Sequence, residues 1–151
     1  MRDKDILALE TLQSIAFTAR LLYPRTGLSI AHALSHPLGA FTGMHHGLAV
    51  VVFLEASMKF NLAGCKDSFH EAERVMGLPY GDGLFLWIRS IIKESGMAEE
   101  ISNYLTSFRN LPVERIASEA LQSSNIPSNP REIGLSETCE IVNESLAIFG
   151  R

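Results

Sequence analysis

Histidine side chains are concentrated in one short part of this 151-residue sequence, where four of the five fall between His32 and His46. His32 and His36 are four residues apart, so on a helix both imidazoles lie on one face, one turn from each other. His46 follows after a bend that contains proline and glycine. Imidazole nitrogens are common ligands of Zn²⁺ and Fe²⁺. The spacing therefore indicates a metal site built from the i,i+4 pair and a more distant histidine.

A purely structural interpretation of the same histidines stays open at this point. A buried histidine usually serves as a hydrogen-bonding residue without any metal. His45 and His46 are adjacent, so on a helix they cannot point at the same ion, and one of them is incidental to a site. His70 lies apart from the others in a polar segment beside Glu71 and Glu73, and we expect it to be a solvated surface residue.

The histidine cluster lies within residues 26–54, which contain no Lys, Arg, Asp or Glu. Length alone would allow this stretch to span a membrane. Its four histidines and Pro37, together with Gly27, Gly39 and Gly43, interrupt the apolar residues, and lipid offers no partners for such polar groups. We expect a buried segment of a soluble protein that surrounds something polar, and no membrane contact.

Apolar residues recur at helical spacing along the whole chain. Proline and glycine mark the ends of the predicted helices: Pro24 ends the first, and Pro37 and Gly39 make continuation of the second doubtful. The predicted helices cover residues 3–22, 29–36, 48–60, 67–76, 84–94, 97–108, 112–122 and 136–149. No strand-like alternation is present. The pattern predicts an all-α fold, a single helical domain over residues 1–151 with about seven or eight helices.

Composition excludes several classes of protein. The chain is 46% hydrophobic and 20% charged with a net charge of −4, which is typical of a globular domain. It has no basic stripe of the kind that binds nucleic acid. Cys65 and Cys139 lie far apart and are expected to be free thiols. Together with a charged amino terminus that does not resemble a signal peptide, they favour a cytoplasmic location.

The histidine segment resembles the signature of iron-containing (group III) alcohol dehydrogenases. Residues 32–40 read HALSHPLGA, and His46-Gly47 follows before an apolar helix, which matches the pattern HxxxHxLGA and then HG. Met76-Gly77-Leu78 and Asn129-Pro130-Arg131 are similar to two further family segments. The resemblance covers nearly the whole chain and implies the family's C-terminal helical domain, which is of the dehydroquinate synthase-like type.

This resemblance implies roles for three histidines. His32 and His46 match two ligands of the family's catalytic metal, Fe²⁺ or Zn²⁺. His36 matches a histidine that faces the nicotinamide and substrate and assists proton movement. In the family the metal stabilises the alkoxide of a small alcohol while hydride passes to NAD(P)⁺, and the reverse reaction reduces an aldehyde.

Two parts of the family's machinery are not found in these 151 residues. The other metal ligands of the family are an aspartate and a histidine in a DxxxH motif, and no aspartate here has a histidine four positions later. The glycine-rich turn of the N-terminal cofactor-binding domain is also not found. We therefore expect a chain with no cofactor-binding residues of its own, inactive alone, that needs a partner chain carrying the N-terminal domain.

Two other hypotheses remain open. The first is a non-catalytic helical binding module that keeps the fold and uses exposed apolar surface to form a homo-oligomer or to bind a partner. The second is a self-contained metal protein that uses His36, His45 or a carboxylate as an additional ligand. Two departures from the family bear on these hypotheses, since His45 and Glu55 stand where many family members have proline.

Overall fold

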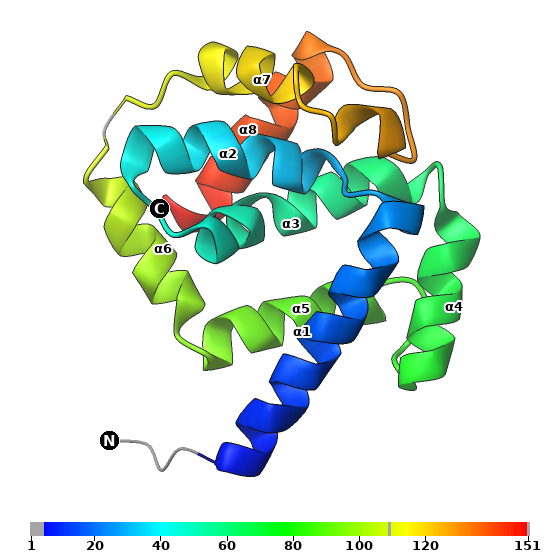
Figure 1. Cartoon of the computed structure of the whole chain (residues 1–151). Coiled ribbons are helices and arrows are strands. Elements are labelled where there is room, and N and C mark those ends of the chain that lie inside the picture. Colours follow the sequence, from blue (N-terminus) through cyan, green and yellow to red (C-terminus); the bar gives the residue numbers. More distant parts are fainter. Residues whose placement is uncertain (1–4, 109, 151) are drawn as a thin grey trace.

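The computed structural model describes residues 5–108 and 110–150, and these residues form helices joined by short turns (Figure 1). No strand occurs in these ranges, so the predicted all-α fold is confirmed, with eight α-helices and one short 3₁₀ turn. The elements are α1 (Ile6–Thr26), α2 (Ile30–Thr42), α3 (His46–Leu62), α4 (Lys66–Met76), α5 (Gly83–Glu94), α6 (Met97–Thr106), α7 (Val113–Leu121), η1 (Ile126–Ser128) and α8 (Leu135–Phe149).

The core is built around α2 and α3. Helix α2 packs against α3 and α7, and α8 packs against the same two helices. Ile30, Leu34 and Leu38 recur every four residues on α2, and each is completely buried. Burial of one such side chain stabilises the fold by roughly 1.5–3 kcal/mol. The helices that carry the clustered histidines are therefore also the most firmly packed ones.

The uncharged stretch of residues 26–54 forms α2 and the first half of α3, and it supplies much of this core, as expected. In residues 5–108 and 110–150, no single helix is both long and apolar enough to cross a bilayer. Helices α3 and α4 reach that length only as a pair, and the pair is bent by 119°.

Two helix boundaries differ from the prediction because proline did not end the helices. Pro24 lies inside the last turns of α1, and α2 continues through Pro37 to Thr42. Proline costs a helix one hydrogen bond. In α2 that cost is outweighed because Leu34 and Leu38, on either side of Pro37, are both buried in the core. Residue 3, where the first helix was predicted to begin, lies outside the described residues, and Asp5 is the N-cap of α1.

Helix α1 contrasts with the core, because none of its residues is buried. Eight large apolar side chains on it are 52–74% exposed: Ile6, Leu7, Leu9, Leu12, Ile15, Phe17, Leu21 and Leu22. On α5, Trp87 and Ile91 are 42% and 39% exposed. An extended apolar surface of this kind is typical of a site where other protein packs.

Helix α4 carries a buried carboxylate that the sequence did not single out. Its Glu73 is only 2% exposed, and its carboxylate accepts hydrogen bonds from Gly81 N (2.8 Å) and Leu84 N (3.3 Å). These bonds lower the pKa of Glu73 and attach the loop before α5 to α4. His70 on the same helix is partly exposed, and its Nδ1 lies 2.8 Å from the Tyr80 hydroxyl.

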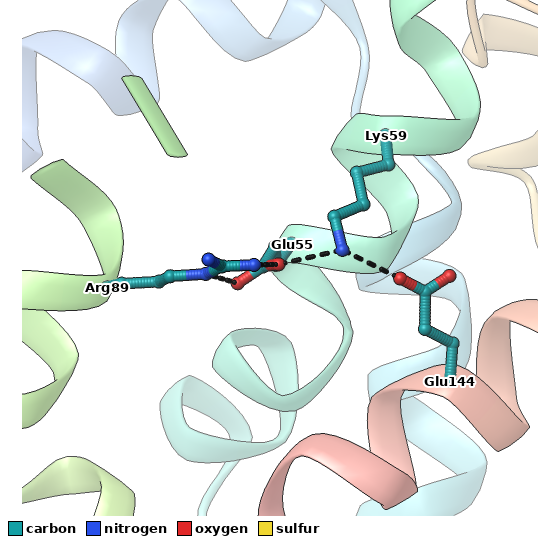
Figure 2. Close-up of polar contacts among 4 residues, drawn as sticks. All are labelled: Glu55, Lys59, Arg89 and Glu144. Carbon is teal, nitrogen blue, oxygen red and sulfur yellow. Dashed lines mark hydrogen bonds and ion pairs between the residues drawn. The ribbon is translucent and has the colours of Figure 1, made fainter. Parts of the chain in front are cut away.

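A cluster of charged residues joins three helices (Figure 2). Glu55 on α3 is 6% exposed. Its carboxylate accepts two hydrogen bonds from the Arg89 guanidinium on α5, and the one donated by Nε is 2.7 Å long. Lys59 Nζ lies 2.9 Å from Glu55 Oε1 and 2.8 Å from Glu144 Oε1 on α8. The hydrogen bonds from Arg89 are the main cause that lowers the pKa of Glu55. The ionised cluster therefore connects α3 to α5 and α8.

A polar connection of a different kind fixes the start of α2. The Asn129 carboxamide oxygen accepts a hydrogen bond from Ile30 N (3.2 Å), one of the free donors at the helix amino terminus. The Asn129 and Asn61 carboxamides also bond to each other in both directions, at 2.8 and 2.9 Å. Asn61 lies near the end of α3 and is 5% exposed. The loop after α7 thus holds the amino end of α2 and the carboxyl end of α3 together.

We expect Glu55→Gln to lower the free energy of unfolding at pH 7 by about 1.5 kcal/mol, as measured by urea denaturation. This is the low end of the range for hydrogen bonds to charged groups, because Arg89 and Lys59 are 54% and 40% exposed. The folded-state pKa of Glu55 is lowered, so its contribution is present at neutral pH and is lost as the pH falls through that value.

Glu144→Gln is the matched control, because Glu144 is 47% exposed and a surface ion pair contributes about 0–1 kcal/mol. The assignment of Glu55 would be wrong if the two variants were equally stable. It would also be wrong if the deficit of Glu55→Gln persisted undiminished in strongly acidic buffer.

Asn129→Ala is expected to destabilise the chain by about 1–3 kcal/mol, because it leaves Ile30 N and the buried Asn61 carboxamide without a partner. The measurement is again denaturant unfolding. The control is Asn103→Ala on the exposed face of α6, which should stay within about 0.5 kcal/mol of wild type. Equal stability of the two variants would show that Asn129 does not hold the helix ends together.

Candidate metal centre

The structure brings together the three histidines that carried the predicted site. His32 lies in the first turn of α2, His36 one turn later, and His46 is the first residue of α3. The ring of His46 is 5.7 Å from that of His32 and 5.4 Å from that of His36, measured between centroids. The planes of His36 and His46 are inclined by only 24°, so these two rings are stacked.

His45 has a different place, as expected for one of two adjacent histidines. It is the N-cap residue of α3, and its Nδ1 accepts a hydrogen bond from Gly47 N at 3.3 Å. A side chain oxygen or nitrogen in this position satisfies one of the free donors at a helix start. His45 therefore caps the helix on which His46 stands.

A close approach of two backbone segments determines where His46 lies. After α2 the chain turns at Gly43, which has a φ of 70°, and folds back over the helix. A Cβ atom on residue 39 would lie 3.3 Å from the Met44 carbonyl oxygen, so glycine at this position gives the returning chain room. Met44 itself is 4% exposed and anchors the turn in the core.

A second glycine positions the segment that leads into α2. Gly27 has a φ of 68°, which side chains rarely allow. A Cβ atom there would also overlap the side chain of Ser128, at 2.3 Å from its Cβ. Ser128 Oγ donates a hydrogen bond to the Leu28 carbonyl oxygen. The turn before α2 thus packs directly onto η1, next to Asn129.

The electrostatic surroundings keep His32 in a form that can bind a metal. Partial burial is the main cause that lowers the pKa of His32, and the neighbouring imidazoles of His46 and His36 lower it further. A lowered pKa leaves the ring neutral at physiological pH, with a nitrogen lone pair available for a cation. Buried Ser35 contacts two of these residues, with its Oγ 2.8 Å from the His32 carbonyl oxygen and 3.3 Å from His46 Nδ1.

The donors on this chain suit a divalent transition metal but do not complete its coordination. Neutral imidazole is a typical ligand of Zn²⁺ and Fe²⁺. Within the part of the chain that the structure describes, no three His, Cys, Asp or Glu side chains are placed to hold one ion together. The expected ligands His32 and His46 thus fit a metal as part of a larger set, and the self-contained metal protein receives no support.

A groove of about 480 Å³ adjoins the exposed side chain of His36. Its other wall comes from the end of α7 and the loop that follows, with Glu119, Gln122 and Asn125 among its lining residues. A groove with carboxylate and carboxamide groups can accept and donate hydrogen bonds to a hydroxylated molecule beside His36. Sequence spacing gave no signal for it, because α7 lies about eighty residues beyond His36.

Comparison with known proteins agrees with this geometry. The model of the Fe-containing alcohol dehydrogenase family, C-terminal, matches residues 1–146. Lactaldehyde reductase of Escherichia coli (strain K12) is 26% identical over 148 residues, which are 92% of this chain and 37% of that protein. 1,3-Propanediol dehydrogenase of Citrobacter freundii is 26% identical over 149 residues, 93% of this chain and 38% of that protein.

A solved structure shares the fold. The crystal structure of 1,3-propanediol oxidoreductase superimposes with a TM-score of 0.62 and 25% identity, covering 78% of this chain and 32% of that one. The residues present here thus span little more than a third of these relatives. By its family match, its helical fold and its three convergent histidines, the chain belongs to the Fe-containing alcohol dehydrogenase family and corresponds to its C-terminal domain.

Proposed function

We propose that this chain is the metal-binding half of an NAD(P)-dependent alcohol or aldehyde oxidoreductase. The observation that carries the proposal is the convergence of the His32, His36 and His46 rings at the junction of α2 and α3. In this assignment His32 and His46 hold Fe²⁺, or alternatively Zn²⁺, and His36 is the catalytic histidine. The names of the relatives, lactaldehyde reductase and 1,3-propanediol dehydrogenase, favour a small alcohol or aldehyde as substrate.

Each residue contributes a separate part of the chemistry. When bound, the metal supplies Lewis-acid stabilisation of the negative charge on the substrate oxygen. His32 and His46 fix its position from two different helices. His36 borders the groove next to the stacked ring of His46, and its ring nitrogens can pass a proton to or from a substrate held there. Gln122 and Asn125, across the groove from His36, can orient a hydroxyl group of the substrate.

The remaining ligands and the nicotinamide site would come from residues outside this chain. Two imidazoles are half of a four-ligand site. The exposed rings of His36 and His46 leave the open side of the site accessible to another protein surface. We propose that a partner chain with the N-terminal, cofactor-binding domain completes the site, and that the chain alone is inactive. The cytoplasmic location stays a prediction.

A second candidate function is a non-catalytic helical module. The observation that favours it is α1, where eight large apolar side chains are exposed along a 21-residue helix. In this alternative α1 mediates a homo-oligomer, and the histidines are a remnant of the family. Sedimentation of the purified chain distinguishes the two: a stable dimer that binds neither Fe²⁺ nor Zn²⁺ would favour the module.

Metal titrations of the purified chain test the ligand assignment, with Fe²⁺ under anaerobic conditions and with Zn²⁺. Because two protein ligands hold the ion, we expect measurable but weak binding, which His32→Ala or His46→Ala removes. His36→Ala should keep it, because His36 is not assigned as a ligand. His70→Ala, a histidine on α4 away from the site, is the matched control. Undiminished binding in a variant that lacks both His32 and His46 would contradict the assignment.

Activity of the chain tests the missing half separately. The purified chain should show no NAD(P)-dependent oxidation of 1,3-propanediol or reduction of lactaldehyde. Addition of a cofactor-binding domain from a family member should restore turnover only if both halves assemble, and His36→Ala should lower it without loss of assembly. Robust turnover by the chain alone would show that the site needs no partner.

A further inference from the structure

A buried serine lies between the two proposed metal ligands. Ser35 on α2 is 1% exposed, and its Oγ is 2.8 Å from the His32 carbonyl oxygen and 3.3 Å from Nδ1 of His46. It therefore touches the backbone of one proposed ligand and the imidazole ring of the other. Neither the histidine spacing nor the family resemblance assigned a role to this residue.

The hydroxyl group has one proton, and the two distances indicate where it goes. The shorter contact is with the His32 carbonyl oxygen, which can only accept a hydrogen bond, so Ser35 donates to it. Towards His46 the Ser35 oxygen then offers only lone pairs, which can only accept a hydrogen bond. The 3.3 Å contact then requires His46 to donate from Nδ1–H. A neutral imidazole that is protonated at Nδ1 carries its free lone pair on Nε2.

We propose that Ser35 is a positioning residue that holds His46 in the Nδ1–H tautomer and so presents Nε2 to the metal. The inference rests on the proposed function of His46 as a ligand. It follows a general feature of metal sites, in which the second ring nitrogen of a ligand histidine donates to a fixed acceptor that orients the ring. Here the acceptor lies on α2, so the helix that carries His32 also orients the ligand from α3.

A simpler role for Ser35 would be local. Serine in a helix often donates to a carbonyl one turn earlier with no further function. That role would leave the tautomer of His46 unaffected, so the tautomer distinguishes the two. The chain also offers a matched control in Ser57 on α3, which is 2% exposed and whose hydroxyl has no hydrogen-bond partner in the described residues.

The first experiment reads the tautomer directly in the metal-free chain. Long-range ¹H–¹⁵N correlation spectra of the labelled protein at pH 8.5 report which ring nitrogen of His46 is protonated, with His46→Gln to assign the signals. We expect the Nδ1–H form in wild type and in Ser57→Ala. Ser35→Ala should shift His46 towards the Nε2–H form, and Ser35→Thr, which keeps the hydroxyl, should retain Nδ1–H.

The second experiment measures Zn²⁺ affinity for the same four chains by calorimetry. Loss of an outer partner of a ligand histidine typically weakens metal binding about 10- to 100-fold, and we expect that loss in Ser35→Ala with recovery in Ser35→Thr. An Nε2–H tautomer in wild type, or equal tautomer populations in wild type and Ser35→Ala, would overturn the inference. Equal Zn²⁺ affinity of those two chains would also overturn it.

Failure of the proposed function would give a different result. If none of the chains bound Zn²⁺ while the tautomer still depended on the Ser35 hydroxyl, the orientation of His46 by Ser35 would stand. The assignment of His46 as a metal ligand would then be contradicted.

Discussion

After α2 the chain folds back so closely over the helix that a Cβ atom on residue 39 would lie 3.3 Å from the Met44 carbonyl oxygen. This approach sets the start of α3, and the position of His46 beside His36 and His32 depends on it. The hydrophobic core stabilises this arrangement, because Ile30, Leu34 and Leu38 on α2 are completely buried in it. A side chain at residue 39 would crowd the Met44 carbonyl oxygen, two residues before His46.

Polar connections between distant residues support the same helices from their ends. The Asn61–Asn129 pair joins the end of α3 to the start of α2, and Glu55 joins the middle of α3 to α5 and α8. The interior around the site is thus held together by packing and by polar contacts, while the site itself opens at an exposed surface. Ligands that are supported from behind and open on one side suit a metal site that further ligands complete. The bare apolar surface of α1 shows that the described residues do not bury all of their own hydrophobic groups.

Sequence patterns predicted those features that depend on neighbours in the chain. The i,i+4 spacing predicted that His32 and His36 share one helix, and the apolar periodicity predicted an all-helical chain. Both patterns are local, and both predictions were confirmed in the described residues. Pro37 misled the prediction, because tertiary packing of α2 outweighs the cost of a proline. Glu55 and Asn61 could not be predicted as buried partners, since Arg89 and Asn129 meet them only in the folded chain. The contact of Ser35 with His46 depends likewise on the turn between two helices.

The central claim is that His32 and His46 together hold one divalent metal. X-ray absorption spectroscopy of the Zn²⁺-loaded chain tests it most directly, because imidazole ligands give a distinctive multiple-scattering signal with Zn–N distances of about 2.0–2.1 Å. We expect two imidazole nitrogens, with the remaining ligands being light atoms from solvent, and one imidazole after substitution of either histidine. A spectrum without imidazole ligands, or one with three that persists in His32→Ala, would contradict the assignment of His32 and His46 as ligands.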